Sequence, residues 1–315
     1  MTNSLPTALQ LCPLSAYLET GLATRFQVVR WFDLDAAAQQ AWLADHAAEV
    51  RAVATGGHIG CPSPLMEALP ALQVVAINGV GFDKVDLDLA RARGVRVTTT
   101  PGTLTDDVAD LAIGLVIALL RDIPAAAAHV RQGDWPKAER PLARKVSGRR
   151  FGILGLGHIG HAVATRLAAF GPVAYYDPHR KDVPFDYVAD LETLAAQSDV
   201  LFVAASANPA TRHLVNADVI AALGPDGYLV NISRGSVVDE AALTEAIVTG
   251  RLAGAALDVF ENEPHVPDAL RTSDRTVLTP HIASATVETR KAMADLVLAN
   301  LDAVMSGREP PAAVA

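Results

Sequence analysis

The stretch Phe151–Gly160, which reads Phe-Gly-Ile-Leu-Gly-Leu-Gly-His-Ile-Gly, constrains the fold of this chain more than any other. A short apolar strand leads into the pattern Gly-x-Gly-x-x-Gly, and an alanine-rich helix is expected to follow it to about Phe170. Gly155 permits a tight turn, Gly157 lets a pyrophosphate approach the backbone, and Gly160 lets the helix pack closely on the strand. The N–H groups at the start of the helix can hold the anion. The stretch therefore predicts a dinucleotide-binding unit, with an ordinary glycine-rich turn as the weaker alternative.

An acidic residue stands at the distance that such a unit requires. The next apolar run, Val173–Tyr176, ends at Asp177, and 177 − 155 = 22 residues separate this acid from the first glycine. A carboxylate at this point accepts hydrogen bonds from the hydroxyls of the adenosine ribose. The strand, the helix and the acid together favour dinucleotide binding.

The composition excludes several classes of protein. At 315 residues the chain is long enough for two domains, and its net charge of −9, without any block of lysine or arginine, argues against a nucleic-acid partner. Cys12 and Cys61 are too few and too isolated for a disulfide framework or a zinc cluster, so we expect no metal. The N-terminus lacks a signal-peptide pattern, and no apolar run reaches the ~18 residues that span a bilayer. We therefore expect a cytoplasmic protein with no membrane partner.

Short apolar runs alternate with helically spaced segments along the chain, which is typical of parallel sheets covered on both faces. In the first part the expected strands are Ala8–Cys12, Phe26–Trp31, Val50–Ala54, Val74–Ile77 and Val95–Thr98, and the expected helices are Ala36–Ala47 and Lys84–Arg93. In the second part the expected strands are Phe151–Leu154, Val173–Tyr176, Val200–Ala204, Tyr228–Ile232, Ala255–Val259 and Val277–Thr279, and the expected helices are His158–Phe170, Leu191–Gln197, Ala217–Ala222 and Glu240–Thr249. The sequence therefore predicts an α/β fold with two doubly wound, Rossmann-like domains built on parallel sheets.

A long apolar helix separates the two alternating parts. It is expected over Val108–Leu120 with Thr105 or Asp106 as its N-cap, and a second helix, Pro124–Arg131, follows it. We interpret the long helix as the crossover between the two domains. A last amphipathic helix is expected from Thr286 to about Met305.

A second glycine-rich turn, Asn78-Gly79-Val80-Gly81, follows the expected strand Val74–Ile77. In open α/β sheets small ligands bind at the carboxyl ends of the strands. The exposed N–H groups of such a turn can hold a carboxylate. An ordinary strand-to-helix turn is the alternative.

Three polar residues, Arg234, Glu263 and His281, each come shortly after an expected strand of the second part. Because the carboxyl ends of parallel strands meet at one edge, we expect these side chains on the same edge as the Gly155 turn. Arginine can bind a carboxylate bidentately, and histidine can give or take the proton that accompanies hydride transfer. A paired glutamate keeps the histidine charged and fixes its ring. Each residue alone could be an ordinary surface side chain, but together they predict an active site.

The sequence resembles the D-isomer-specific 2-hydroxyacid dehydrogenase family, and within it the glyoxylate/hydroxypyruvate reductase branch. The resemblance covers nearly the whole chain and is carried by Asn78–Gly81, Gly155–Gly160, Asn231–Glu240, Ala256–Phe260 and Pro280–Ser284. It implies NAD(P)H-dependent reduction of glyoxylate or hydroxypyruvate to the D-2-hydroxy acid. A reductase of 2-ketogluconate, pyruvate or phenylpyruvate stays open. So does a dinucleotide-sensing corepressor, which is a protein of another class.

The resemblance also implies roles for particular residues. His281 is the expected acid/base, Glu263 is its partner, and Arg234 binds the substrate carboxylate. Cofactor contacts are implied for Thr105, Gly155, Gly157, His158, Ile159, Gly160, Asp177, Pro178, His179, Arg180, Ala205, Thr211, Ile232, Ser233, Asp258, His281 and Ala283. Among these, Asp258 is expected to hold the nicotinamide carboxamide. Substrate contacts are implied for Asn78, Val80, Gly81, Arg234, His281, Ser284 and Trp135, the last of which a partner subunit can lend.

The family fold implies a discontinuous substrate domain, residues 1–99 and 285–315, around an NAD(P)-binding domain of residues 100–284. A homodimer formed through the cofactor domain is expected. Many reductases of this branch carry Ser-Arg or Gly-Arg after the second strand, where this chain has Asp177-Pro178-His179-Arg180. A carboxylate repels the 2′-phosphate of NADP and accepts a hydrogen bond from a free 2′-hydroxyl, so NAD is favoured. His179 and Arg180 lie close enough to leave NADP open.

Overall fold

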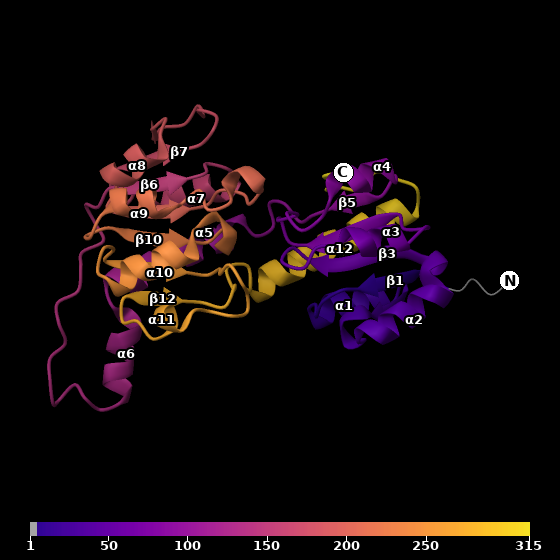
Figure 1. Cartoon of the computed structure of the whole chain (residues 1–315), viewed down its shortest axis with the longest axis horizontal. Coiled ribbons are helices and arrows are strands. Elements are labelled where there is room, and N and C mark those ends of the chain that lie inside the picture. The colour runs from indigo at the N-terminus through magenta and orange to yellow at the C-terminus, as the bar shows by residue number, and fades with distance from the viewer. Residues whose placement is uncertain (1–4) are drawn as a thin grey trace. The chain divides into compact units, whose positions relative to one another are not determined.

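The computed structural model describes residues 5–315, and these form two compact units, coloured by residue number in Figure 1. Unit 1 contains the residues up to Leu104 together with Ala285–Ala315, and unit 2 contains Thr105–Ser284. Unit 1 is therefore discontinuous in the sequence. It extends to Leu104 rather than to residue 99, and the functional names of the two domains stay predictions.

Unit 1 is built on a parallel five-stranded sheet with the order β2-β1-β3-β4-β5. Its strands are β1 (Thr7–Gln10), β2 (Gln27–Arg30), β3 (Val50–Gly56), β4 (Val74–Asn78) and β5 (Arg96–Thr98). Its α-helices are α1 (Ala16–Ala23), α2 (Ala36–His46), α3 (Ser63–Ala68), α4 (Leu87–Ala92) and α12 (Val287–Met305), with short 3₁₀ helices at η1 (Trp31–Asp33) and η2 (Ala47–Glu49).

The two faces of this sheet carry side chains of different size. Ala52 and Ala76 pack in the core cluster that includes the buried leucines of α1 and the buried residues of α12. Their neighbours Val53 and Val75 point to the opposite face and pack with residues such as Met66 of α3. Each fully buried side chain of valine or methionine size contributes roughly 1.5–3 kcal/mol to the free energy of unfolding. Both faces of the sheet are thus covered, which explains why its strands read as continuous apolar runs.

The last residues of the chain pair with the edge strand β5. Val97 N donates to Ala315 O (2.9 Å), and Val314 N donates to Val97 O (2.8 Å). The buried Asn300 of α12 ties the same segment down, because its Nδ2 donates to Thr99 O (3.2 Å) and its Oδ1 accepts from Ala312 N (3.0 Å). Residues 285–315 therefore supply both a covering helix and a protected edge to unit 1.

Unit 2 is built on a parallel seven-stranded sheet with the order β12-β11-β10-β9-β6-β7-β8. Its strands are β6 (Phe151–Leu154), β7 (Val173–Tyr176), β8 (Asp186–Tyr187), β9 (Val200–Val203), β10 (Tyr228–Asn231), β11 (Gly254–Leu257) and β12 (Thr276–Leu278). Its α-helices are α5 (Thr105–Leu120), α6 (Ile123–Arg131), α7 (His158–Leu167), α8 (Leu191–Gln197), α9 (Ala217–Leu223), α10 (Glu240–Val248) and α11 (Asp268–Arg271), with 3₁₀ helices at η3 (Pro209–Thr211) and η4 (Gly235–Val237). Read from β8, the strand order reverses between β6 and β9, which is the switch point of a doubly wound dinucleotide fold.

The predicted fold class is confirmed, and several details differ. The short elements α1, α3, α11 and β8 were not expected from the sequence. The N-cap predicted for the long helix is wrong, because α5 already begins at Thr105 and thus contains Asp106 in its first turn. There the Asp106 carboxylate accepts a hydrogen bond from Arg166 of α7 (2.9 Å) instead of capping α5.

Helix α6 and the segment after it project from the rest of unit 2 in Figure 1. Helix α6 has no buried residue. Trp135 and Leu142 in the following segment are 70% and 99% exposed. We call α6 and residues 132–145 the arm.

Among residues 5–315, no single helix is long and apolar enough to cross a membrane. Helices α5 and α6 reach that length and composition only as a pair, and they are bent by 65° at the break between them. The apolar side of α5 packs within unit 2, against α7 and the strands β10 to β12.

Candidate active site

The turn between β6 and α7 leaves no room for side chains at two of its glycines. Gly155 has φ +88°, and a Cβ on it would lie 2.6 Å from the Cα of Ala205, which follows β9. A Cβ on Gly160 would lie 2.0 Å from the carbonyl oxygen of Gly155. Both contacts are with backbone atoms that cannot move aside. The first turn of α7 therefore lies directly against the strand end at the switch point of the sheet.

The third glycine of the motif faces open space. A Cβ on Gly157 would meet no atom within 4 Å, and Gly157 is the N-cap of α7 without a side chain to cap it. Gly157 and His158 are exposed. The first N–H groups of the helix thus face open space that a side chain would partly occupy, which is the arrangement that binds a pyrophosphate. The residues present fit a dinucleotide.

Asp177 follows β7, and its carboxylate forms two hydrogen bonds and an ion pair with nearby residues. Its Oδ2 accepts from Leu156 N in the glycine turn (3.0 Å), its Oδ1 accepts from His179 N (3.0 Å), and Lys181 Nζ lies 3.3 Å from the same oxygen. Burial alone would raise the pKa of this carboxyl, but the two N–H groups and the lysine together hold it below its usual value. The acid is therefore ionised at neutral pH. Lys181, which the sequence reasoning passed over, directly follows the two basic residues considered for NADP.

The other predicted cofactor contacts lie at the same edge of unit 2 or near it. Pro178, His179 and Arg180 are exposed in the turn after β7. The hydroxyl of Thr211 is committed to its own loop, where it donates to Ser206 O (2.9 Å). Ile159, Ile232, Ser233 and Thr105 lie in α7, after β10 and at the start of α5. Their contacts with a cofactor stay predictions.

Glu263 and His281 form a close pair at the carboxyl ends of adjacent strands. Glu263 follows β11 and His281 follows β12, and Glu263 Oε2 lies 2.8 Å from His281 Nδ1. The two side chains are 25% and 33% exposed, so solvent and small molecules can reach them. Burial would raise the pKa of Glu263, but the hydrogen bond and charge of His281, the N–H of Phe260 and the charge of Arg234 lower it. The pair is therefore a carboxylate facing an imidazole, which is suited to acid/base work.

A buried carboxylate shapes the turn that presents His281. Asp258 has no exposed surface, and it accepts hydrogen bonds from Thr279 Oγ1 (2.7 Å), Ile282 N (2.9 Å) and Ala283 N (2.9 Å). Its carbonyl accepts from His281 N (2.8 Å), and His281 has a left-handed backbone with φ 53°. Asp258 was expected to hold the nicotinamide carboxamide. In the structure it positions His281, and the role toward the carboxamide stays a prediction.

Arg234 is presented by a turn that Asn231 organises. Asn231 is buried at the end of β10, its Oδ1 accepts from Ser233 N (3.1 Å), and its Nδ2 donates to the carbonyl of Arg234 (3.0 Å). Arg234 Nη1 donates to the carbonyl of Ser233 (2.9 Å). The guanidinium acts electrostatically on Glu263, which follows the neighbouring strand. The sequence reasoning used Asn231 only as part of a motif, and the structure shows what its amide does.

The glycine-rich turn of unit 1 has the features of a ligand loop. Asn78 Oδ1 is buried and has no hydrogen-bond partner among residues 5–315. The N–H groups of Val80 and Gly81 donate to no backbone carbonyl among residues 5–315. A buried polar side-chain atom in a folded protein normally has a hydrogen-bond partner. These observations support binding of a polar ligand over the plain turn.

The remaining predicted substrate contacts are in unit 2. Ser284 is half-buried after the His281 turn. Trp135 lies in the exposed arm. Within residues 5–315, neither side chain has a hydrogen bond that would fix its role.

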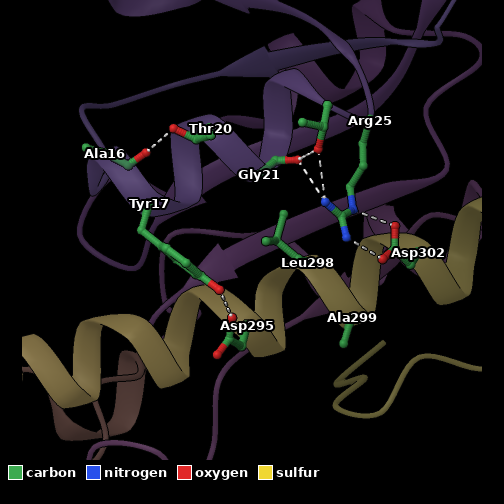
Figure 2. Close-up of a pocket in the computed structure, with 10 residues that line it drawn as sticks. Ala16, Tyr17, Thr20, Gly21, Arg25, Asp295, Leu298, Ala299 and Asp302 are labelled. Atoms are coloured by element: carbon green, nitrogen blue, oxygen red, sulfur yellow. Dashed lines mark hydrogen bonds and ion pairs between the residues drawn. The ribbon is translucent and has the colours of Figure 1, made fainter.

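Figure 2 shows a pocket elsewhere, between α1 and α12 of unit 1. Arg25 binds Asp302 through two hydrogen bonds (2.7 and 2.9 Å), and Tyr17 Oη donates to Asp295 (2.7 Å). These polar groups are already paired with each other. The pocket contains none of the predicted site residues. The paired side chains that line it connect the two helices, and we assign no reaction to it.

Residues 113–283 match the family described as "D-isomer specific 2-hydroxyacid dehydrogenase, NAD binding domain". The chain is 49% identical over 302 residues to a hydroxyphenylpyruvate reductase of Plectranthus scutellarioides, covering 95% of this chain and 96% of the relative. It is 44% identical over 308 residues to a 2-ketogluconate reductase of Gluconobacter oxydans, covering 97% of each.

A similar solved structure is the NADPH-dependent glyoxylate/hydroxypyruvate reductase of Sinorhizobium meliloti in complex with NADP and malonate, with a TM-score of 0.91 and 43% identity over 99% of this chain and 97% of that one. These matches cover both units, the glycine turn and the Glu263–His281 pair. The chain therefore belongs to the D-isomer-specific 2-hydroxyacid dehydrogenase family.

Proposed function

We propose that the protein reduces glyoxylate or hydroxypyruvate to the D-2-hydroxy acid with NAD(P)H, and that His281 is the acid. Reduction of a 2-keto acid is the activity that its relatives support. The observation that carries the proposal is the Glu263–His281 pair, 2.8 Å apart, on the same sheet edge as a glycine turn that fits a dinucleotide.

The chemistry follows from how the pair is arranged. A bound reduced nicotinamide supplies the hydride. Because Nδ1 of His281 faces Glu263, His281 holds the proton to be transferred at Nε2 and gives it to the oxygen of the former carbonyl. Arg234 binds the substrate carboxylate and so fixes its orientation.

The experiment that tests the reaction follows the loss of NADH or NADPH absorbance with hydroxypyruvate and with glyoxylate in parallel. We expect rapid oxidation with at least one of the two acids. Two of the relatives named above are a hydroxyphenylpyruvate reductase and a 2-ketogluconate reductase, so the bulkier acids 2-ketogluconate and phenylpyruvate serve as comparison substrates. Turnover with these alone would overturn the proposed substrates and leave a 2-keto acid reductase.

We also propose that NADH is the preferred cofactor, because an ionised Asp177 repels a 2′-phosphate. Asp177→Ser removes this charge and releases Lys181, so the ratio of kcat/KM for NADPH to that for NADH should rise by about tenfold. Asp182→Ser, which removes an exposed acid next to the same lysine, is the matched control. An unchanged ratio in Asp177→Ser would place the discrimination at His179 or Arg180 instead.

The arm is the surface that we propose for a homodimer. Its exposed apolar side chains, Trp135 and Leu142 among them, are unusual for a surface that stays in water. The chain mass is 33.1 kDa, so light scattering of the purified protein should give about twice that value.

A further inference from the structure

The segment between β11 and α11 carries two glutamates, and each faces a histidine. Glu263 Oε2 lies 2.8 Å from His281 Nδ1, and Glu261 Oε1 lies 2.8 Å from His213 Nε2. Arg212 Nη2 also donates to Glu261 at 2.8 Å. The segment is thus held at two neighbouring points, and only one of them belongs to the proposed catalytic pair.

Glu240 holds the same segment from α10. Its Oε2 accepts a hydrogen bond from the backbone N–H of Glu261 at 3.0 Å. Glu240 is the first residue of α10, and the N-cap Asp239 accepts from Ala242 N at 3.0 Å. The helix is anchored in the core of unit 2 by buried residues such as Leu243. The carboxyl group of Glu240 therefore projects from a fixed element.

The direction of the Glu263 side chain depends on this stretch of backbone. Its Oε1 accepts from Phe260 N (3.1 Å), while its Oε2 holds His281. On the other side a Cβ on Gly235 would lie 1.9 Å from the carbonyl carbon of Phe260, so η4 lies directly against the segment. A shift of the Glu261 backbone would move Phe260 and Glu263 together, because it lies between them.

We propose that Glu240 is a positioning residue for the Glu263–His281 pair, acting through the N–H of Glu261 and through its own charge. This inference rests on the proposed function, in which His281 is the acid. Glu240 itself touches neither substrate nor cofactor in this assignment.

The charges around Glu240 make its role dependent on pH. Burial raises the pKa of Glu240, and the neighbouring carboxylates of Glu261 and Glu263 raise it further against the opposing hydrogen bond from Glu261 N. The basic partners of these two carboxylates are Arg212, His213, Arg234 and His281. The acids of the other helices packed on α10, Asp218 of α9 and Asp268 of α11, are exposed.

Glu240 carries a negative charge whenever its carboxyl group is ionised. It then adds a negative charge near the pair and favours the protonated imidazole that the reduction needs. Removing the negative charge of Glu240 should therefore make the His281 imidazole lose its proton at a lower pH.

Two variants separate the charge of Glu240 from its hydrogen bond. Glu240→Gln keeps an acceptor oxygen and removes the charge, whereas Glu240→Ala removes both. Glu245→Gln is the control, because Glu245 lies on the same helix, is 68% exposed and pairs with Arg251. In Glu240→Gln we expect the alkaline limb of kcat/KM to move to lower pH by about half a unit. In Glu240→Ala we expect the same shift and a kcat about tenfold lower.

A second readout does not depend on turnover. The imidazole signals of His281, followed by NMR against pH in the substrate-free protein, should show the same shift of midpoint in Glu240→Gln. Profiles and NMR midpoints of Glu240→Gln that coincide with those of the wild type and of Glu245→Gln would overturn the inference. If the NMR midpoint shifts but no 2-keto acid is reduced by the wild type, the proposed function is wrong and the positioning role of Glu240 stands.

Discussion

Replacing His281 by alanine should lower kcat for the 2-keto acid by about 10²–10⁴-fold, while the affinity for NADH stays within a few-fold of the wild type. The physical reason is that the variant keeps the dinucleotide turn at Gly155–Gly160 and loses the imidazole that Glu263 holds in place to protonate the new alkoxide oxygen. Steady-state rates and a fluorescence titration with NADH measure the two effects separately.

The backbone conformation of His281 suggests a second variant that is expected to fold normally, so that a loss of activity cannot be attributed to misfolding. Its φ of 53° is a conformation that asparagine tolerates better than most residues, so His281→Asn should keep the turn intact while being unable to transfer the proton. His46→Ala, which removes an exposed histidine of unit 1, is the control. Turnover of His281→Asn near the wild-type rate would show that another group is the acid.

Replacing Arg234 by alanine should lower kcat/KM by about 10²–10³-fold, which corresponds to roughly 3–4 kcal/mol of lost charge-assisted binding. Arg234→Lys should recover only part of this loss, because lysine keeps the charge but cannot form the planar two-point contact with a carboxylate. The wild type and both variants are assayed with the keto acid at saturating NADH.

A substrate without a carboxylate tests where Arg234 acts. The wild type should strongly prefer a 2-keto acid to the corresponding 2-keto amide, and Arg234→Ala should lose most of this preference. Arg251→Ala, which removes an exposed arginine paired with Glu245, should behave like the wild type. If the preference for the acid is the same in Arg234→Ala as in the wild type, the carboxylate is bound elsewhere.

The sheets and the dinucleotide turn were predictable because their signals are local. The three glycines of the turn stand together in the short segment Gly155–Gly160, and the apolar runs reflect burial on both faces. The residue at which α5 starts was not predictable in the same way. Both Thr105 and Asp106 are good caps, but Asp106 is bound by Arg166, which lies 60 residues further along the chain. The two-residue strand β8 is too short to show any periodicity.

The site shows a similar division. The positions of Arg234, Glu263 and His281 after successive strands place them at one edge, and the structure pairs the last two. The groups that orient them were not visible in the sequence. Asp258 and Glu240 act through backbone N–H groups more than 20 residues away, and every residue except proline carries such a group. A pattern of side chains cannot single out that kind of partner.

The way in which residues 285–315 complete unit 1 sets the order in which the protein can fold during synthesis. Unit 2 is contiguous and is whole once Ser284 has left the ribosome. The strands of the unit 1 sheet are synthesised earlier. We expect this sheet to reach its final structure only after α12 covers one face and Val314 and Ala315 pair with β5. Domains generally fold from the N-terminal end as they emerge, and this chain reverses that order. Until then the apolar face of the sheet, around Ala52 and Ala76, is exposed to solvent, and a nascent chain in this state is a natural client for a chaperone.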